Sequence, residues 1–500
     1  MTIVEERAAV LPASKRGPEL LPLDAGEQYR FSFAMDACVG CHSCEVACAE
    51  QNATPVDKAW RRVGELEGGT FPATRRFSLS MACNHCLEPT CLSGCPTGAY
   101  TKLANGVVSH DAEECIGCQY CIWNCPYEVP VFDKAAKVVA KCDMCLPRLE
   151  AGQSPACVLA CPTQAIGVEP VNVAAWRADH AEADAPGLPP AAITLSTTRV
   201  VAPAGLPPLA GATDHAVEPE DPHWPLVALT LLTQVSLGAV AATVVAGAAG
   251  ADVGGGATAA ALAGAVALGA SLLHLGRPTR AFKALRNWRT SWLSREVALL
   301  GAFAALSLAD AAAWALGGAG RVVIGLAAVA LGAAGVYASG RLYLVPARPV
   351  WDSRRTLVAF FATAAAVGPL LSLLCLDRAG LATRPAGALL AASAAGLLAQ
   401  LGVAAHLRST LARRDDAQHA GTRQLLEGRY RQLLVGRVAA VPVALALIAW
   451  SLAVPFAGPA ATGRLATALA VAALGELAGR HLFYVTVVPY RVAGNFFTTR

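Results

Sequence analysis

The sequence predicts a two-part chain: a small, cysteine-rich α+β domain followed by an all-α transmembrane bundle of eight helices. Three observations predict this division. Sixteen of the 17 cysteines lie between Cys38 and Cys161, the mean hydropathy is +0.45, and apolar stretches of about 20 residues recur after Trp224. Because only 15% of the 500 residues are charged, a wholly soluble protein is excluded.

Composition divides the chain into four regions. They are an N-terminal extension (1–30), the cysteine-rich domain (31–170), an Ala/Pro-rich strap or linker (171–222) and the membrane anchor (223–500). The cysteine-rich domain has β-type runs before its cysteine groups, at 29–35, 75–81, 106–109 and 137–141. The Ala/Pro-rich segment has no sustained apolar period, which favours an ordered strap or a linker over a core. The extension has neither a long apolar run nor a twin arginine, so we expect no secretory signal.

The sixteen cysteines form four groups with short, repeated spacings. The groups are Cys38, Cys41, Cys44 and Cys48; Cys83, Cys86, Cys91 and Cys95; Cys115, Cys118, Cys121 and Cys125; and Cys142, Cys145, Cys157 and Cys161. In each of the last three groups Pro follows the fourth cysteine. Three close cysteines wrap one cubane while the fourth reaches a neighbouring cluster. The pattern predicts four 4Fe-4S clusters in a multi-cluster ferredoxin-like domain; structural zinc sites are the weaker alternative.

Four clusters on one chain would form a series of redox centres that transfers electrons. The sequence has no phosphate loop, dinucleotide fingerprint or Ser/His/Asp set, so it offers no site for two-electron chemistry on a small polar substrate. We therefore expect a non-catalytic subunit whose catalytic partner is a separate chain. The net charge of +4 arises from 40 basic and 36 acidic side chains, and this near balance does not indicate a nucleic-acid partner.

Eight apolar stretches are long enough to cross a bilayer. They run over 225–248, 255–275, 292–316, 321–345, 356–377, 381–406, 433–456 and 463–488. An even number of crossings places both flanks on one side of the membrane. Loops and tail on that side carry nineteen Lys or Arg, against four on the other, so the positive-inside rule favours a cytoplasmic cysteine-rich domain. Arginines that dock a domain or bind a ligand would produce the same bias.

A histidine and a carboxylate flank the loop between the second and third spans. His274 ends one predicted helix and Glu296 begins the next, with arginines between them. At this depth the two groups can accept protons from a hydroquinone, so we predict a quinol site here. His274 would bond a quinol hydroxyl, Glu296 would carry the proton away, and Arg277 with Arg280 would orient the pair and lower the pKa of the carboxyl. The alternative is a capping histidine and a glutamate paired with arginine.

The two halves resemble the four-cluster iron-sulfur subunit and the eight-helix membrane anchor of dimethyl sulfoxide reductase and related molybdoenzymes. Besides the cysteine groups, the segments 271–296, 337–351 (YASGRLYLVPARPVW) and 475–484 (GELAGRHLFY) carry the resemblance. Here one chain fuses subunits that are usually separate. The resemblance implies a molybdopterin-containing catalytic partner, menaquinol or ubiquinol as electron donor, and a multi-pass protein of the bacterial inner membrane. The dimethyl sulfoxide enzyme faces the periplasm, in conflict with the charge bias.

The resemblance also implies how the cysteines share clusters. The groups nest, which gives the sets Cys38, Cys41, Cys44 with Cys161; Cys142, Cys145, Cys157 with Cys48; Cys83, Cys86, Cys91 with Cys125; and Cys115, Cys118, Cys121 with Cys95.

We therefore predict that this subunit passes electrons from membrane quinol through four clusters to a reductase for dimethyl sulfoxide, nitrate or a similar acceptor, with quinol oxidation as its own half-reaction. Two alternatives stay open. One is reverse flow, from a formate- or sulfur-compound-oxidising enzyme into quinone. The other is an ion translocator that uses Glu476, whose expected partner is Arg480 one turn on. No two histidines of the spans look paired, so we expect no haem.

Overall fold

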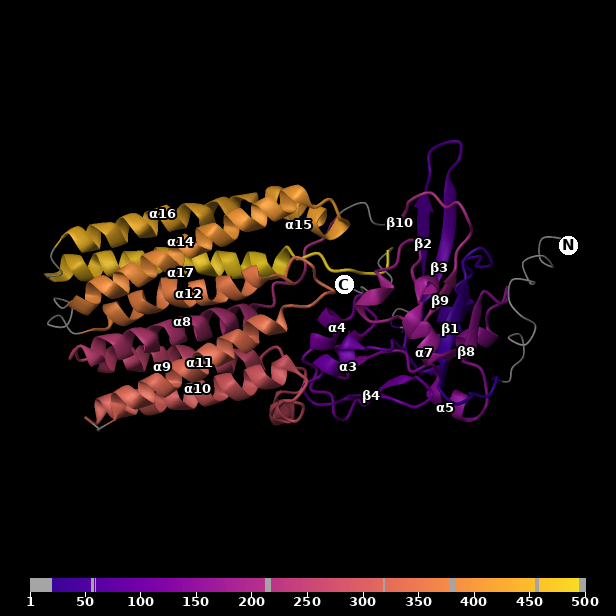
Figure 1. Cartoon of the computed structure of the whole chain (residues 1–500), viewed down its shortest axis with the longest axis horizontal. Helices are drawn as coiled ribbons and strands as arrows, with labels where there is room; N and C mark the ends of the chain where they lie inside the picture. The colour runs from indigo at the N-terminus through magenta and orange to yellow at the C-terminus, as the bar shows by residue number, and fades with distance from the viewer. Residues whose placement is uncertain are drawn as a thin grey trace. The chain divides into compact units, whose positions relative to one another are not determined.

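The computed structural model describes residues 20–54, 58, 60–211, 217–317, 320–376, 384–454 and 458–493. The chain forms two compact units (Figure 1). The first comprises Met1–Ala216 with Pro489–Arg500, and the second is Val217–Val488. The first is a small α+β unit and the second contains eight helices that are long and apolar enough to span a membrane, which confirms the predicted fold class.

The α+β unit contains two three-stranded sheets and two hairpins. In the first sheet β1 (Glu27–Ala34) lies between β8 (Ile166–Asn172), which is antiparallel to it, and β9 (Arg199–Val201), which is parallel. The second sheet has the order β10 (Leu209–Gly211), β2 (Arg62–Gly68), β3 (Arg75–Met81). The hairpins pair β4 (Tyr100–Lys102) with β5 (Val108–His110) and β6 (Val131–Asp133) with β7 (Val138–Ala140).

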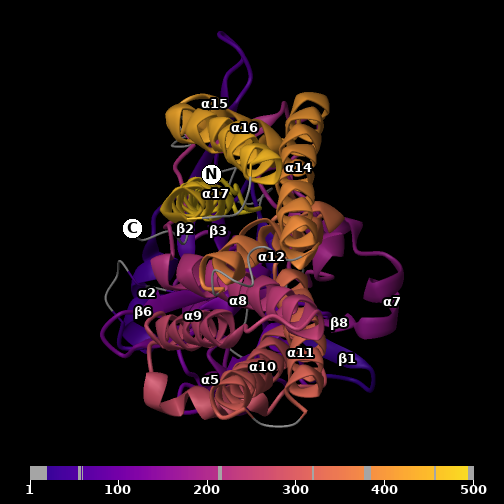
Figure 2. The same cartoon turned by 90° about the vertical axis from the view of Figure 1, so that its left-hand side faces the viewer.

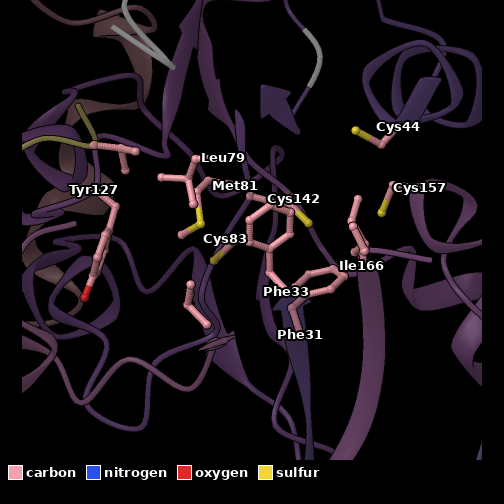
Figure 3. Packing of buried hydrophobic residues seen from close by; sticks show 14 of the residues in the cluster. Phe31, Phe33, Cys44, Leu79, Met81, Cys83, Tyr127, Cys142, Cys157 and Ile166 are labelled. Atoms are coloured by element: carbon pink, nitrogen blue, oxygen red, sulfur yellow. The ribbon is translucent and has the colours of Figure 1, made fainter. Parts of the chain in front are cut away.

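Four short helices carry later cysteines of the four groups. They are α2 (Ser43–Gln51), α3 (Thr90–Gly94), α4 (Tyr120–Asn124) and α6 (Ala156–Leu159); α5 (Leu146–Glu150) directly follows Cys145. The second half of β1 is buried, and its Phe31 and Phe33 pack among buried cysteines (Figure 3). A second apolar cluster contains Cys95, Cys115 and Cys121, so the cysteine loops surround two cores.

The Ala/Pro-rich segment is more structured than the sequence indicates. It contributes α7 (Val173–Ala178), β9 and β10, and its Trp176 belongs to a small apolar cluster with Val171, Ala191 and, from the cysteine-rich domain, Leu87. The Trp176 indole donates a hydrogen bond to the Ser196 carbonyl at 2.8 Å. A single aromatic anchor among alanines gives no periodic pattern, and so the sequence does not reveal this packing.

The second unit is a bundle of the eight predicted spans. They are α8 (Trp224–Ala248), α9 (Gly254–Leu272), α10 (Trp292–Ala315), α11 (Arg321–Leu342), α12 (Arg354–Leu374), α14 (Arg384–Arg413), α16 (Arg431–Ala453) and α17 (Gly458–Val485). Seen along the helices in Figure 2, α8 and α12 occupy the middle of the bundle, and they are its most buried spans. The short α15 (Ala417–Glu427) joins α14 to α16.

Close approach of two backbones explains the central position of α8 and α12. A Cβ on Gly238 would lie 1.9 Å from the Ala364 carbonyl oxygen, and one on Gly368 would lie 2.3 Å from the Gly238 backbone. Only glycine fits such a contact, and small residues at helix crossings are how packing stabilises helix pairs where lipid removes the hydrophobic driving force.

After α17 the chain returns to the first unit. Val492 is buried in the cysteine-rich core, and the Ala493 amide donates to the Gly187 carbonyl at 3.0 Å. The bundle is therefore an insertion into the α+β unit.

Candidate functional site: cysteine cavities and a polar bundle end

Two cavities of the α+β unit are each lined by four thiols. The first holds about 390 Å³ of empty space and is lined by Cys83, Cys86, Cys91 and Cys125. The second holds about 300 Å³ and is lined by Cys95, Cys115, Cys118 and Cys121. These are two of the four expected sets.

The four thiols around each cavity fit an iron-sulfur cluster. Among the described residues no three His, Cys, Asp or Glu side chains converge on one metal-ion position. A 4Fe-4S cubane takes four thiolate ligands, and each cavity is lined by four thiols, so the donor set fits iron-sulfur clusters.

The other eight cysteines lie close together as well. Cys38 and Cys161 interact electrostatically, and so do Cys48, Cys145 and Cys157. Cys44 lies beside both Cys157 and Cys161. The sulfurs of Cys44, Cys142 and Cys157 are visible in one region of the core in Figure 3. How these eight divide between two clusters stays a prediction.

Burial determines the protonation of the free thiols. It raises the pKa of Cys86 and of Cys91 to about 12, with the neighbouring Cys83 as the next cause for both. A thiolate at such a site needs a bound cation, because metal ligation deprotonates the thiol. The apolar surroundings therefore favour metal-bound thiolates over free ones.

Several polar side chains contact the cysteine sulfurs. The Thr194 hydroxyl donates to Cys86 Sγ at 3.2 Å, and the Ser80 hydroxyl lies 3.4 Å from Cys44 Sγ. His85 is fully buried, as expected for a residue that packs beside clusters. Its Nδ1 accepts from the Val108 amide at 3.0 Å, so the ring proton sits on Nε2, which faces Cys142 Sγ at 3.9 Å. Hydrogen bonds to ligand sulfurs tune cluster potentials.

In the bundle, His274 lies beyond its predicted helix. Since α9 ends at Leu272, His274 occupies the following turn, within electrostatic reach of His223 at the start of α8. Burial, with a smaller contribution from the charge of His223, lowers the pKa of His274 to about 4. The imidazole is therefore neutral at neutral pH, as a proton acceptor must be.

Glu296 is the fifth residue of α10, and its side chain is almost fully buried. The Ser339 hydroxyl of α11 lies beside its carboxylate without completing a hydrogen bond. No hydrogen bond or ion pair of the described residues joins Glu296 to His274. The two predicted residues share one end of the bundle, where α9 ends and α10 begins, and make no direct contact.

The structure places the two predicted arginines on the segment after α9. Arg277 is the N-cap residue of the 3₁₀ helix η5 (Pro278–Leu285), and Arg280 lies within this helix. Among the described residues the hydroxyl of Ser339, and neither arginine, is the polar group that acts on the Glu296 carboxyl. The role of the two arginines in orienting His274 and Glu296 stays a prediction.

Two tyrosines at this end were not predicted. Tyr343 directly follows α11, and its hydroxyl lies 2.5 Å from that of Tyr484 on α17. Burial, followed by the charges of Tyr484 and Glu296, raises the pKa of Tyr343 well above its ordinary value. Trp351 and Phe483 stack beside the pair at 4.9 Å. The contact joins residues 141 positions apart, so no local pattern reveals it.

Glu476 does not bind Arg480 as the sequence suggested. Its carboxylate accepts from the Thr363 hydroxyl at 2.6 Å and from the Gln400 amide at 2.8 Å. Arg480 instead donates to Gln234 at 2.6 Å. In a bundle the partners of a buried group come from facing helices, and these partners lie on α8, α12 and α14.

Fold and site define a class, the membrane-anchored iron-sulfur electron-transfer proteins. A family model described as "DMSO reductase anchor subunit (DmsC)" matches residues 220–485, and another, "4Fe-4S dicluster domain", matches residues 75–170. This protein belongs to the DMSO reductase anchor subunit family, with an iron-sulfur domain fused to the anchor. It is a multi-pass membrane protein that binds iron-sulfur clusters, and its functions are electron transfer and membrane anchoring.

Curated relatives match the iron-sulfur half. The sequence is 38% identical to one of the chains of the anaerobic dimethyl sulfoxide reductase of Haemophilus influenzae, over 34% of this chain and 86% of that protein. It is 40% identical to one of the subunits of the sulfite dehydrogenase of Allochromatium vinosum, over 26% of this chain and 64% of the relative. It is 38% identical to the iron-sulfur subunit of the nitrate-inducible formate dehydrogenase of Escherichia coli, over 26% of this chain and 51% of that subunit.

Proposed function

We propose that this chain oxidises membrane quinol and delivers the electrons through four 4Fe-4S clusters to a separate molybdopterin-containing reductase for dimethyl sulfoxide, nitrate or a similar acceptor. The observation that carries the proposal is the union, on one chain, of four-thiol cavities and a membrane bundle whose end holds a neutral histidine and a buried carboxylate. The relatives named as dimethyl sulfoxide reductase chains support a reductase partner.

The cluster count rests on the sixteen cysteines in their expected sets. Bound clusters supply one-electron transfer, while the chain holds the sulfurs and excludes water from them. Anaerobically prepared protein should contain about sixteen iron atoms per chain, four for each cluster. A content near eight would contradict four clusters.

The quinol half-reaction needs proton acceptors at the bundle end. A quinol loses two electrons and two protons, and the neutral His274 ring can accept one hydroxyl proton. Glu296, buried on the neighbouring α10, is proposed to carry the proton away, and Arg277 with Arg280 to orient the pair.

Replacing His274 with Leu tests the site. Quinol oxidation by a menaquinol analogue should fall by about 10²-fold or more, which is the usual size of acid–base catalysis. Dithionite should still reduce the clusters, since their ligands lie elsewhere. His406→Leu, which removes an exposed histidine of α14, is the matched control and should keep the parental rate. A parental rate in the His274 variant would place the site elsewhere.

Reverse flow into quinone is a second candidate, because two relatives are named for sulfite dehydrogenase and formate dehydrogenase. Assays of the purified complex with its catalytic subunit separate the two directions. Quinone reduction driven by formate or sulfite would establish the oxidising role, and quinol-driven reduction of dimethyl sulfoxide or nitrate the reducing one.

We propose a cytoplasmic position for the cysteine-rich unit, supported by the excess of arginine in the loops on its side of the bundle. A green fluorescent protein fused after residue 500 would fluoresce in that topology. Activity of an alkaline phosphatase fusion at the same point would indicate the periplasmic side instead.

A further inference from the structure

Three basic side chains lie inside the cysteine-rich unit without a carboxylate partner. Arg61 is 2% exposed and Lys141 4% exposed, and Lys102 is partly buried. None of the three forms an ion pair with a carboxylate among the described residues of the chain. A buried charge is strongly disfavoured unless an opposite charge or a full set of hydrogen bonds compensates it.

The two lysines satisfy their donors with the backbone. Lys102 donates to the carbonyls of His85, Cys86 and Gly106 at 3.0 to 3.1 Å. Lys141 donates to the carbonyls of Val108 and Cys142. Both therefore have a structural explanation, since they hold cysteine loops to a neighbouring strand.

Arg61 differs because much of its guanidinium has no partner. Its Nη1 donates to the carbonyl and the hydroxyl of Ser80, each at 3.2 Å, whereas Nε and Nη2 are buried without an oxygen acceptor among the described residues. One face of the group stacks on Phe31, with Cζ 4.5 Å from the ring centroid. The remaining N–H groups are the unexplained part of the side chain.

The groups around Arg61 are cysteines of two expected cluster sets, the one that contains Cys44 and the one that contains Cys142 and Cys157. Its charge acts on Cys157, Cys44 and Cys142, and Cys157 faces the guanidinium directly. Burial alone would lower the pKa of Arg61, but these sulfurs outweigh it and raise the pKa above its ordinary value. Figure 3 shows the three cysteines in one part of the core, with Phe31 near them.

We infer that Arg61 is a fixed counter-charge and hydrogen-bond donor for the cluster held by Cys157, and that it raises the reduction potential of this cluster. The inference rests on the cluster assignment under Proposed function. An electron that enters the cluster adds one negative charge, and the same charge leaves with the electron. No bond forms or breaks, and Arg61 keeps its proton throughout. A positive charge and N–H donors beside ligand sulfurs favour the reduced form.

The test is a redox titration of the full-length, iron-loaded protein followed by electron paramagnetic resonance. Arg61→Gln should lower the midpoint potential of the cluster held by Cys157. If the cluster held by Cys44 also responds, two midpoint potentials should fall. The other clusters should keep theirs. Arg61→Lys restores the charge but not the fork of donors, so it should recover part of the shift. The affected signal should be one that Cys157→Ser also alters.

The matched control is Arg76→Gln on β3, the strand that pairs with β2 directly after Arg61. Arg76 is exposed and pairs with Glu65, so its removal should shift no potential. Unchanged potentials in an Arg61→Gln protein with full iron content would overturn the inference. If that variant does not accumulate, an Arg61→Lys protein with parental potentials would overturn it as well. A parental protein with only eight iron atoms would instead contradict the four-cluster proposal.

Discussion

The hydroxyls of Tyr343 and Tyr484 lie 2.5 Å apart, in a contact that ties the end of α11 to the end of α17. The Tyr484 hydroxyl also lies 3.4 Å from the Leu226 carbonyl of α8. Three helices thus meet at two phenol groups beside Glu296. The pair has a structural role in closing this end of the bundle, and it extends the polar region proposed for quinol.

Tyr343→Phe should therefore affect both stability and turnover. It removes one buried hydrogen bond of Tyr484, whose hydroxyl keeps the Leu226 carbonyl as acceptor, so the cost should be about 0.5–1.5 kcal/mol. We expect a lower midpoint of thermal unfolding in detergent together with slower quinol oxidation. Tyr337→Phe, at a 42% exposed tyrosine of α11, is the control and should change neither. Parental turnover in the Tyr343 variant would restrict the pair to a structural role.

The neutral His274 predicts a distinctive pH profile. Its pKa is about 4 in the folded chain and near 6.5 when unfolded, so the unfolded state binds more protons between these values. Stability should fall as pH drops from about 6.5 toward 4, and His274→Gln should lessen that fall.

The rate of quinol oxidation should not fall near pH 6.5 through protonation of His274, because the folded imidazole stays neutral at that pH. Rates measured between pH 5 and 8 check this expectation. A fall in the parental rate near pH 6.5 that disappears in His274→Gln would contradict it.

Single cysteine replacements should remove iron selectively. Cys86→Ala removes one of the four thiols that line the first cavity, so we expect iron to fall by about four atoms per chain. Cys375→Ala is the natural control, because Cys375 caps α12 far along the sequence from the cysteine groups. Loss of iron in that variant would show that the assay reports general instability.

Glu169 should be the most sensitive ionic residue of the β1 sheet. It accepts from Arg30 at 2.8 Å and from two nitrogens of Arg199 at 2.8 and 2.9 Å, and it is buried. Glu169→Ala leaves two arginines without their partner and should destabilise the unit by about 3–5 kcal/mol. Glu65→Ala breaks an exposed pair and should cost about 1 kcal/mol or less. Equal shifts in thermal unfolding would refute this difference.

Sequence patterns predicted what depends on neighbouring residues. Short spacings place Cys115, Cys118 and Cys121 on one loop, and the length of an apolar run specifies a span, so both could be read from the sequence. Partners from distant segments could not. Arg61 faces Cys157 across 96 positions, and Glu476 finds Thr363 and Gln400 on other helices rather than Arg480 on its own. Side-chain partners of this kind depend on how whole elements pack, which no local period encodes.

The return of the chain after α17 has a consequence for biosynthesis. Val492 fills part of the cysteine-rich core and Ala493 bonds to Gly187, yet the ribosome makes both residues only after the last span. The core around the first cysteines thus stays open at this point until the whole membrane segment has been synthesised. Completion of the iron-sulfur unit is thereby coupled in time to completion of the anchor, and a chain truncated within the bundle lacks the segment that closes the core.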